Sequence, residues 1–170
     1  ASDVYKRQAI NIRKNGIFQL LSAYNMTIGK NKNLTDGENI HWENVYKLIE
    51  YLSKEEWNSI KKEYINRNKI EKRFLPDKTL EEQMERYLHT PTRNREIEKY
   101  INPLEPYWEK RYYDVLFNSN DTTNFKRRVS TNYLEGLEWV MRYYTTGCYN
   151  WRWHYKFNYP PLLKDLVKFI

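Results

Sequence analysis

The sequence predicts a mainly α-helical domain with one extended, aromatic-rich arm near the carboxy-terminal end. Apolar residues recur at helical spacing in most segments, and polar stretches with glycine or proline separate those segments. One stretch differs: in GCYNWRWHYKFNYPP, residues 147–161, aromatic rings alternate with hydrogen-bonding or cationic side chains. Strict alternation is typical of extended backbone. Because no other stretch predicts a partner strand, we expect the arm to lie across the helices.

The first part of the chain predicts three helices. Apolar residues at helical spacing indicate one helix from Ile10 to Met26 and a second that carries an apolar stripe from Ile40 to Leu52. Ser53 stands three residues before Glu56, which is the capping-box pattern. We therefore expect a new helix to begin at Ser53 and to run through Ile65.

The middle of the chain, residues 66–106, is mostly polar and contains several prolines, so it predicts only short helices. We expect these around Glu81–Leu88 and Arg95–Ile101. A further helix is expected at Trp108–Phe117, where large apolar side chains recur at helical spacing. The polar run NSNDTTN that follows predicts a loop.

The most regular helix is expected after this loop. Asn132 stands three residues before Glu135, a box-like start, and Gly147 predicts a stop in the left-handed conformation. Gly136 inside the helix costs about 1 kcal/mol relative to alanine, so we expect it to permit a close backbone approach by another element. The expected apolar face of this helix consists of Leu134, Leu137, Met141 and Tyr144.

Composition favours an anionic partner and an intracellular protein. The net charge is +7, which suits nucleic acid or an acidic membrane surface. The single cysteine, Cys148, excludes an internal disulfide, and a reducing compartment is the simplest interpretation. We find no apolar run of membrane-spanning length and no signal peptide, so we expect no membrane association.

No catalytic constellation and no metal site are expected within this chain. The histidines, His41, His89 and His154, have no ligand-like spacing with one another or with Cys148. The sequence contains neither a glycine-rich phosphate loop nor a GxSxG elbow. Any chemistry of a parent protein is therefore expected from residues outside this chain.

Two interpretations of the aromatic arm follow from its pattern. Its rings can stack on nucleic-acid bases while neighbouring Arg152 and Lys156 neutralise phosphates. Alternatively, the rings only seal the core, because each buries a large apolar area. More rings share one face than a single stacking site needs, so we expect most of them to be structural under either interpretation.

The segment YLEGLEWVMRYYTTGCYNWRWHYKFNYPPLLKDL, residues 133–166, resembles the conserved helical region of the eukaryotic 5′→3′ exoribonucleases, the XRN family. The family's Tyr-x-Glu-Gly-Leu-x-Trp-Val helix begins here at Tyr133, and its Trp-x-Trp arm corresponds to Trp151 and Trp153. Residues 33–56 resemble a second family pattern, Leu-Thr-x-x-Gly-x-Ile-Asn before a helix. The arm departs from the family at Lys156, where the family has proline.

The resemblance implies processive removal of nucleotides from RNA with a 5′-monophosphate. It implies that a separate amino-terminal catalytic domain binds Mg²⁺ and packs against this helical region, which alone is inactive. A tryptophan of the arm, either Trp151 or Trp153, is expected to stack on the RNA end, with Arg152 and Lys156 as further RNA-binding residues. The parent is expected in the nucleus or the cytoplasm. The alternative is a non-catalytic helical RNA-binding or scaffold module.

Both ends of the chain have features of a fragment. Residues 1–8 contain DVYKRQ, which resembles the translation of a sequencing adapter, and we exclude them from the domain. A helical apolar pattern after Pro161 stops without a glycine cap or a polar tail. We therefore expect residues 9–170 to be a partial helical domain that is truncated at both ends.

Overall fold

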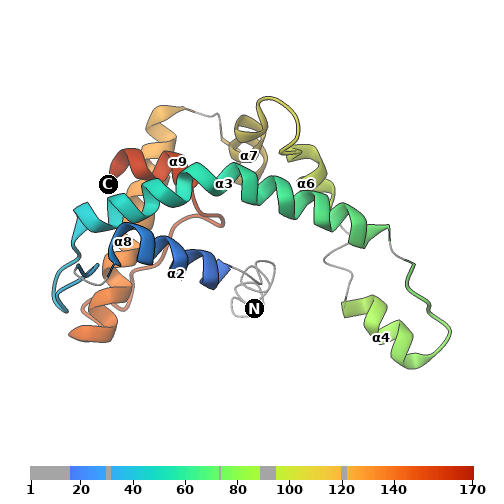
Figure 1. Ribbon diagram of the computed structural model, residues 1–170, viewed down its shortest axis with the longest axis horizontal. Helices are drawn as coiled ribbons and strands as arrows, with labels where there is room; N and C mark the ends of the chain where they lie inside the picture. The colour runs from blue at the N-terminus through green and yellow to red at the C-terminus, as the bar shows by residue number, and fades with distance from the viewer. Residues whose placement is uncertain (1–15, 30–31, 73, 89–94, 120–121) are drawn as a thin grey trace. The chain divides into compact units, whose positions relative to one another are not determined.

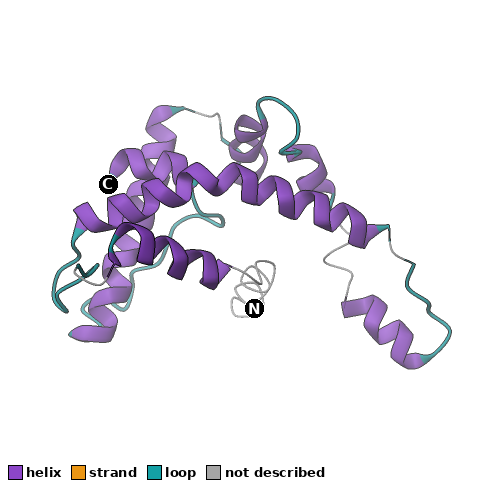
Figure 2. Cartoon of the chain, in the orientation of Figure 1, coloured by secondary structure: helices purple, strands orange, loops and turns teal. Residues whose placement is uncertain are grey.

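The computed structural model describes residues 16–29, 32–72, 74–88, 95–119 and 122–170. Within these ranges helices are joined by loops and turns, and no strand forms (Figure 2). The predicted mainly α-helical class is therefore confirmed. Residues 1–8, which we expect to derive from an adapter, lie outside the described residues.

The chain divides into two compact units. The first contains Ala1–Lys54, Arg127–Lys156 and Pro160–Ile170, and the second contains Glu55–Lys126 and Phe157–Tyr159. The described elements, labelled in part in Figure 1, are α2 (Gly16–Thr27), α3 (Trp42–Glu71), α4 (Leu80–Leu88), α6 (Glu96–Ile101), α7 (Trp108–Phe117), α8 (Thr123–Thr145), α9 (Leu163–Leu166) and the 3₁₀ turn η2 (Val167–Phe169).

The core of the first unit takes apolar side chains from several helices. Two hydroxyl groups of this unit also contact methionine sulfur: the Tyr51 hydroxyl lies 3.0 Å from Met26 Sδ, and Thr35 Oγ1 lies 3.2 Å from Met141 Sδ. Together these contacts tie α3 to α2 and the loop before α3 to α8. The buried apolar residues of this unit are Ala23, Ile28, Val45, Leu48, Val129, Leu134, Leu162 and Leu166.

The predicted helix start at Ser53 is wrong, because Ser53 lies inside α3, which is continuous from Trp42 to Glu71. The residues predicted to follow it, through Ile65, are helical as part of α3. A capping residue needs non-helical backbone so that its side chain can reach the next amides. Ser53 Oγ instead donates to the backbone oxygen of Glu50, one turn earlier, at 2.8 Å. This local bond satisfies the hydroxyl without ending the helix.

The predicted start at Asn132 is also wrong, because α8 begins at Thr123. Asn132 is buried, and its Nδ2 donates to Glu135 Oε2 at 2.8 Å. Its Oδ1 accepts a hydrogen bond of 2.9 Å from the backbone N–H of Lys156 in the arm. The Asn–Glu pair that resembles a cap in sequence therefore fixes the arm to the middle of the helix.

In the second unit a buried arginine links α6 to α3. The side chain of Arg95 is 1% exposed and donates to both carboxylate oxygens of Glu98, at 3.0 and 2.8 Å. It also donates to Asn68 Oδ1 at 2.9 Å and to Glu71 Oε2 at 3.1 Å. Burial opposes the charged form of Arg95, but the hydrogen bond and charge of Glu98 outweigh it, so the pKa of Arg95 is raised.

The second unit also contains an aromatic cluster around Phe117, the last residue of α7. The Phe117 ring stacks on Tyr113 at 5.4 Å and meets Phe125 edge to face at 5.6 Å. Two rings of the arm join it, Phe157 at 6.1 Å and Tyr159 at 6.2 Å. These two arm residues therefore pack in the aromatic core of this unit.

Candidate nucleic-acid interface

Gly147 ends α8 as predicted. Its φ is +94°, in the left-handed region that favours glycine, and its N–H donates to the backbone oxygen of Arg142 at 3.0 Å. The Thr146 N–H donates to the same oxygen at 2.8 Å. These bonds satisfy a carbonyl at the helix end, and the arm begins immediately after it.

The arm runs back along α8 from the end of the helix towards its middle. Apart from Trp151, which lies in a turn against Tyr143, successive arm residues contact successively earlier helix residues. The contacts, in order along the arm, are Arg142 over the Tyr149 ring at 5.3 Å, Trp139 Nε1 donating to the backbone oxygen of Asn150 at 2.9 Å, Trp153 against Gly136, Tyr155 against Tyr133 at 5.8 Å, and the backbone N–H of Lys156 donating to Asn132 Oδ1.

Burial alternates along most of the arm, although the arm forms no strand. A turn at Trp151 and Arg152 interrupts the extended backbone that the alternation predicts. The half-buried rings are Trp153, Tyr155, Phe157 and Tyr159, and the exposed side chains between them are His154, Lys156 and Asn158. From residue 153 onwards, the predicted aromatic and polar faces are present.

Trp153 packs tightly on α8. A Cβ added to Gly136 would lie 2.7 Å from Trp153 Cη2, closer than non-bonded carbons approach, so glycine is required there for the ring to fit. The Trp153 ring also stacks on Trp139, with centroids 5.8 Å apart and planes 20° apart. Gly136 was expected to permit a close backbone approach by another element, and the group that approaches it is the side-chain indole of Trp153.

Trp151 is placed differently, because 79% of its surface is exposed. Its ring meets Tyr143 edge to face at 6.4 Å, so one edge is supported while much of the indole faces solvent. Tyr143 in turn stacks on Trp139 at 5.4 Å, with planes 11° apart. Trp151 is thus an exposed ring that rests on a column of packed rings.

The structure separates the two cationic residues predicted for this site. Arg152 is exposed in the same turn as Trp151, and its backbone N–H donates to Asn150 Oδ1 at 3.0 Å. Lys156 is exposed at the level of Asn132, whereas Trp151 lies at the level of Tyr143. These helix levels are about 16 Å apart at 1.5 Å per residue. Arg152 therefore adjoins Trp151, and Lys156 lies further along α8.

Three tyrosines near Trp151 were not predicted as site residues. Tyr143 is 42% exposed, Tyr144 is 82% exposed and Tyr149 is 57% exposed. The placement of Tyr144 on the apolar face of α8 was wrong, because the helix turns its ring to solvent at its last turn. The tyrosine run before Gly147 is the sequence signal that could have identified these residues.

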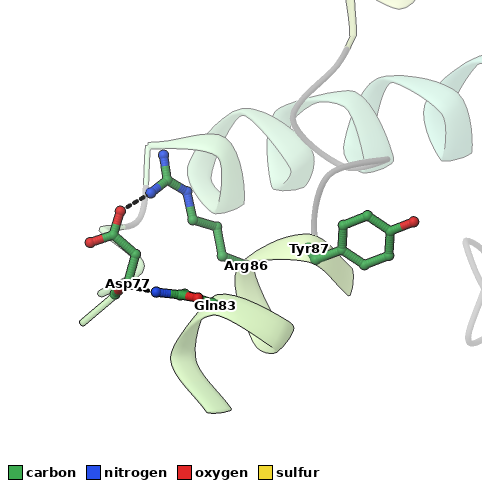
Figure 3. A pocket seen from close by; sticks show the side chains of 4 residues that line it. All are labelled: Asp77, Gln83, Arg86 and Tyr87. Carbon is green, nitrogen blue, oxygen red and sulfur yellow. Dashed lines mark hydrogen bonds and ion pairs between the residues drawn. The ribbon is translucent and has the colours of Figure 1, made fainter. Parts of the chain in front are cut away.

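Other features of the described residues add no second site. An open hollow of about 340 Å³ is lined by Asp77, Gln83, Arg86 and Tyr87 (Figure 3). Asp77 and Arg86 form an ion pair with each other, and Figure 3 shows Tyr87 pointing away from that pair. Among the described residues no group of three histidine, cysteine, aspartate or glutamate side chains could hold a metal ion. His89 lies outside those residues.

None of the helices in the described ranges is long and apolar enough to cross a membrane.

The fold and the exposed rings together define an all-helical domain with an aromatic and cationic surface. Residues 92–170 match the family described as the Xrn1 helical domain. This match supports the prediction from the sequence motifs that the chain is a fragment of an XRN-family protein.

Individual relatives agree with this family. The chain is 42% identical over 66 residues to the 5′-3′ exoribonuclease 2 homolog of Caenorhabditis briggsae and to 5′-3′ exoribonuclease 2 of Gallus gallus, which covers 38% of this chain and 7% of each relative. It is 40% identical over 62 residues to 5′-3′ exoribonuclease 1 of Saccharomyces cerevisiae, covering 36% of this chain and 4% of that relative. The chain thus spans only a small part of these relatives.

Proposed function

We propose that this chain is part of a 5′→3′ exoribonuclease that degrades RNA with a 5′-monophosphate, and that its arm holds the RNA by stacking. The kinship of residues 92–170 with the Xrn1 helical domain supports the enzyme class. The observation that carries the binding role is the exposure of Trp151, inside that matched region. A large indole in water is a ready platform for an unpaired base.

The arm residues take distinct roles in this proposal. Trp151 stacks on a base near the 5′ end, a contact worth about 1 to 3 kcal/mol. Arg152 adjoins it and neutralises a nearby phosphate, while Lys156 attracts the backbone several nucleotides away. Trp153 holds the arm on α8 and does not touch RNA. The tight contact of Trp153 with Gly136 supports this division.

The remaining machinery is proposed to lie outside this chain. Mg²⁺ is bound by an amino-terminal catalytic domain of the parent and supports hydrolysis there, so the chain alone is inactive. That domain packs against the exposed apolar side chains of α2, because an apolar patch of this kind marks a contact surface. We place the parent inside the cell, in the nucleus or the cytoplasm. The exposed apolar residues of α2 are Ile17, Phe18, Leu20, Leu21 and Met26.

The full-length parent tests the enzymatic part of the proposal. It is incubated with Mg²⁺ and end-labelled RNA that carries either a 5′-monophosphate or a 5′-hydroxyl. Progressive loss from the 5′ end of the monophosphate substrate alone is the expected result. RNA that is bound but left intact would instead support a non-catalytic helical RNA-binding or scaffold module.

Replacing Trp151 with alanine is expected to weaken single-stranded RNA binding by about 10- to 100-fold, because one stacked base is lost. Trp151→Phe keeps an aromatic face and should lose much less. Binding is measured by fluorescence anisotropy of a labelled octanucleotide at one fixed salt concentration, since phosphate contacts make affinity salt-dependent. Circular dichroism should show unchanged helicity. If Trp151→Ala binds the octanucleotide with the same affinity as the unsubstituted protein, the stacking role of Trp151 is contradicted.

A further inference from the structure

We infer that the RNA-binding surface extends beyond Trp151 onto Tyr144 and Tyr149, which provide additional stacking positions for neighbouring bases of one single strand. This inference rests on the proposed function of the same surface. We call Tyr143, Tyr144, Tyr149 and Trp151 the ring patch. All of them lie at the end of α8 and the start of the arm, within the first unit.

Three rings of the patch, Tyr143, Tyr144 and Trp151, are connected by ring contacts. Tyr143 is the central ring of the three: it meets Tyr144 edge to face at 5.3 Å and Trp151 edge to face at 6.4 Å. Tyr144 and Trp151 therefore lie one ring contact from the same tyrosine, close enough for neighbouring bases of one strand. Both are at least 79% exposed, so each offers a face to a ligand.

The patch is held in place through Tyr143, which packs on further aromatic rings. Trp139 stacks between Tyr143 and Trp153, and its Nε1 donates to the backbone oxygen of Asn150 at 2.9 Å. The support comes from α8 and from an arm segment fixed by several contacts. Rings held in this way lose little conformational freedom when a base stacks on them, which favours binding.

Charge around the patch suits a nucleic-acid strand. The Arg142 guanidinium lies 5.3 Å from the centre of the Tyr149 ring, and Arg142 also pairs with Glu138 at 2.6 Å. Arg152 is exposed beside Trp151. Tyrosine and tryptophan faces between arginines bind bases by stacking and attract phosphates, without reading base edges. The ligand class is therefore single-stranded RNA of any sequence, because duplex bases hide their faces.

The test compares short and long RNA on the 170-residue chain. Affinities for a labelled uridine dinucleotide and a labelled octanucleotide are measured for three proteins: the unsubstituted chain, Trp151→Ala and the double variant Tyr144→Ala/Tyr149→Ala. The double variant should bind the octanucleotide at least about tenfold more weakly and the dinucleotide as the unsubstituted chain does. Trp151→Ala should weaken both. The matched control is Tyr87→Ala on α4, whose side chain is also largely exposed, and it should change neither affinity.

The outcomes separate this inference from the proposed stacking of Trp151. If Trp151→Ala weakens binding but the double variant keeps full octanucleotide affinity, the extension is overturned and the tyrosines are left as a protein contact. If Trp151→Ala has no effect, the Trp151 assignment fails. If the unsubstituted chain shows no saturable binding of the octanucleotide, both the stacking role of Trp151 and its extension to the tyrosines are overturned. Tyr144→Phe/Tyr149→Phe should restore affinity, and failure to do so would overturn stacking as the mode of contact.

Discussion

Replacing Arg95 with methionine is expected to lower the free energy of unfolding by about 3 kcal/mol at neutral pH, because it leaves the largely buried carboxylate of Glu98 without its main partner. This is the lower end of the range for breaking a buried pair. Glu98 and Glu71 keep about a quarter of their side-chain surface exposed, so water offsets part of the loss. Urea denaturation followed by circular dichroism measures the change.

A second arginine provides a matched control for this prediction. Arg142 also pairs with a glutamate, Glu138, but both side chains are more than 40% exposed. Arg142→Met should therefore cost about 1 kcal/mol or less, as exposed pairs do. Arg95→Lys should fall between the two variants, because a lysine keeps the charge but cannot reproduce the fork of donors on Glu98. Equal losses for Arg95→Met and Arg142→Met would contradict the prediction.

The effect of Arg95→Met should depend on pH. Burial alone would raise the pKa of Glu98, but hydrogen bonds from Arg95 and then Arg67 outweigh it and lower this pKa from its ordinary value. A carboxyl group with a lowered pKa stabilises the folded state above its unfolded pKa and loses this effect as the pH falls through its folded pKa. The difference in the free energy of unfolding between the unsubstituted chain and Arg95→Met should therefore be largest at neutral pH and decrease below about pH 4.5. A difference that stays constant down to pH 3 would exclude this ion pair as its source.

Replacing Gly136 with alanine is expected to destabilise the chain by about 1 to 3 kcal/mol, although alanine normally favours helix interiors. The added Cβ would lie 2.7 Å from Trp153 Cη2, so the indole must move away from α8 and from its stacking partner Trp139. Trp153→Ala alone should cost about 3 kcal/mol, since it removes a large ring from a packed site.

The double variant distinguishes steric conflict from other causes. With alanine at position 153 there is no ring for the new Cβ to meet, so Gly136→Ala should become stabilising by about 1 kcal/mol in that background. The reversal of sign is read from a double-mutant cycle of urea denaturation free energies. If Gly136→Ala has the same sign in both backgrounds, the contact with Trp153 does not explain the glycine.

The sequence determined those helices whose limits depend on local signals. Trp108–Phe117 was predicted with its observed bounds, because a polar run follows directly and proline precedes it closely. Gly147 was predicted to end α8 because glycine takes a positive φ without strain, and it does so. The motif around Trp151 and Trp153 also indicated the XRN family, since the spacing of rare aromatic residues is specific.

Tertiary structure decided those features for which one sequence pattern is compatible with two different structural environments. The boxes at Ser53 and Asn132 are compatible with both a helix start and a helix interior, and the surrounding packing selected the interior. Trp151 and Trp153 have the same residue type on the same alternating face, so sequence could not rank them. A turn exposes Trp151, and the surface at Gly136 accepts Trp153, because burial depends on which distant residues a side chain meets.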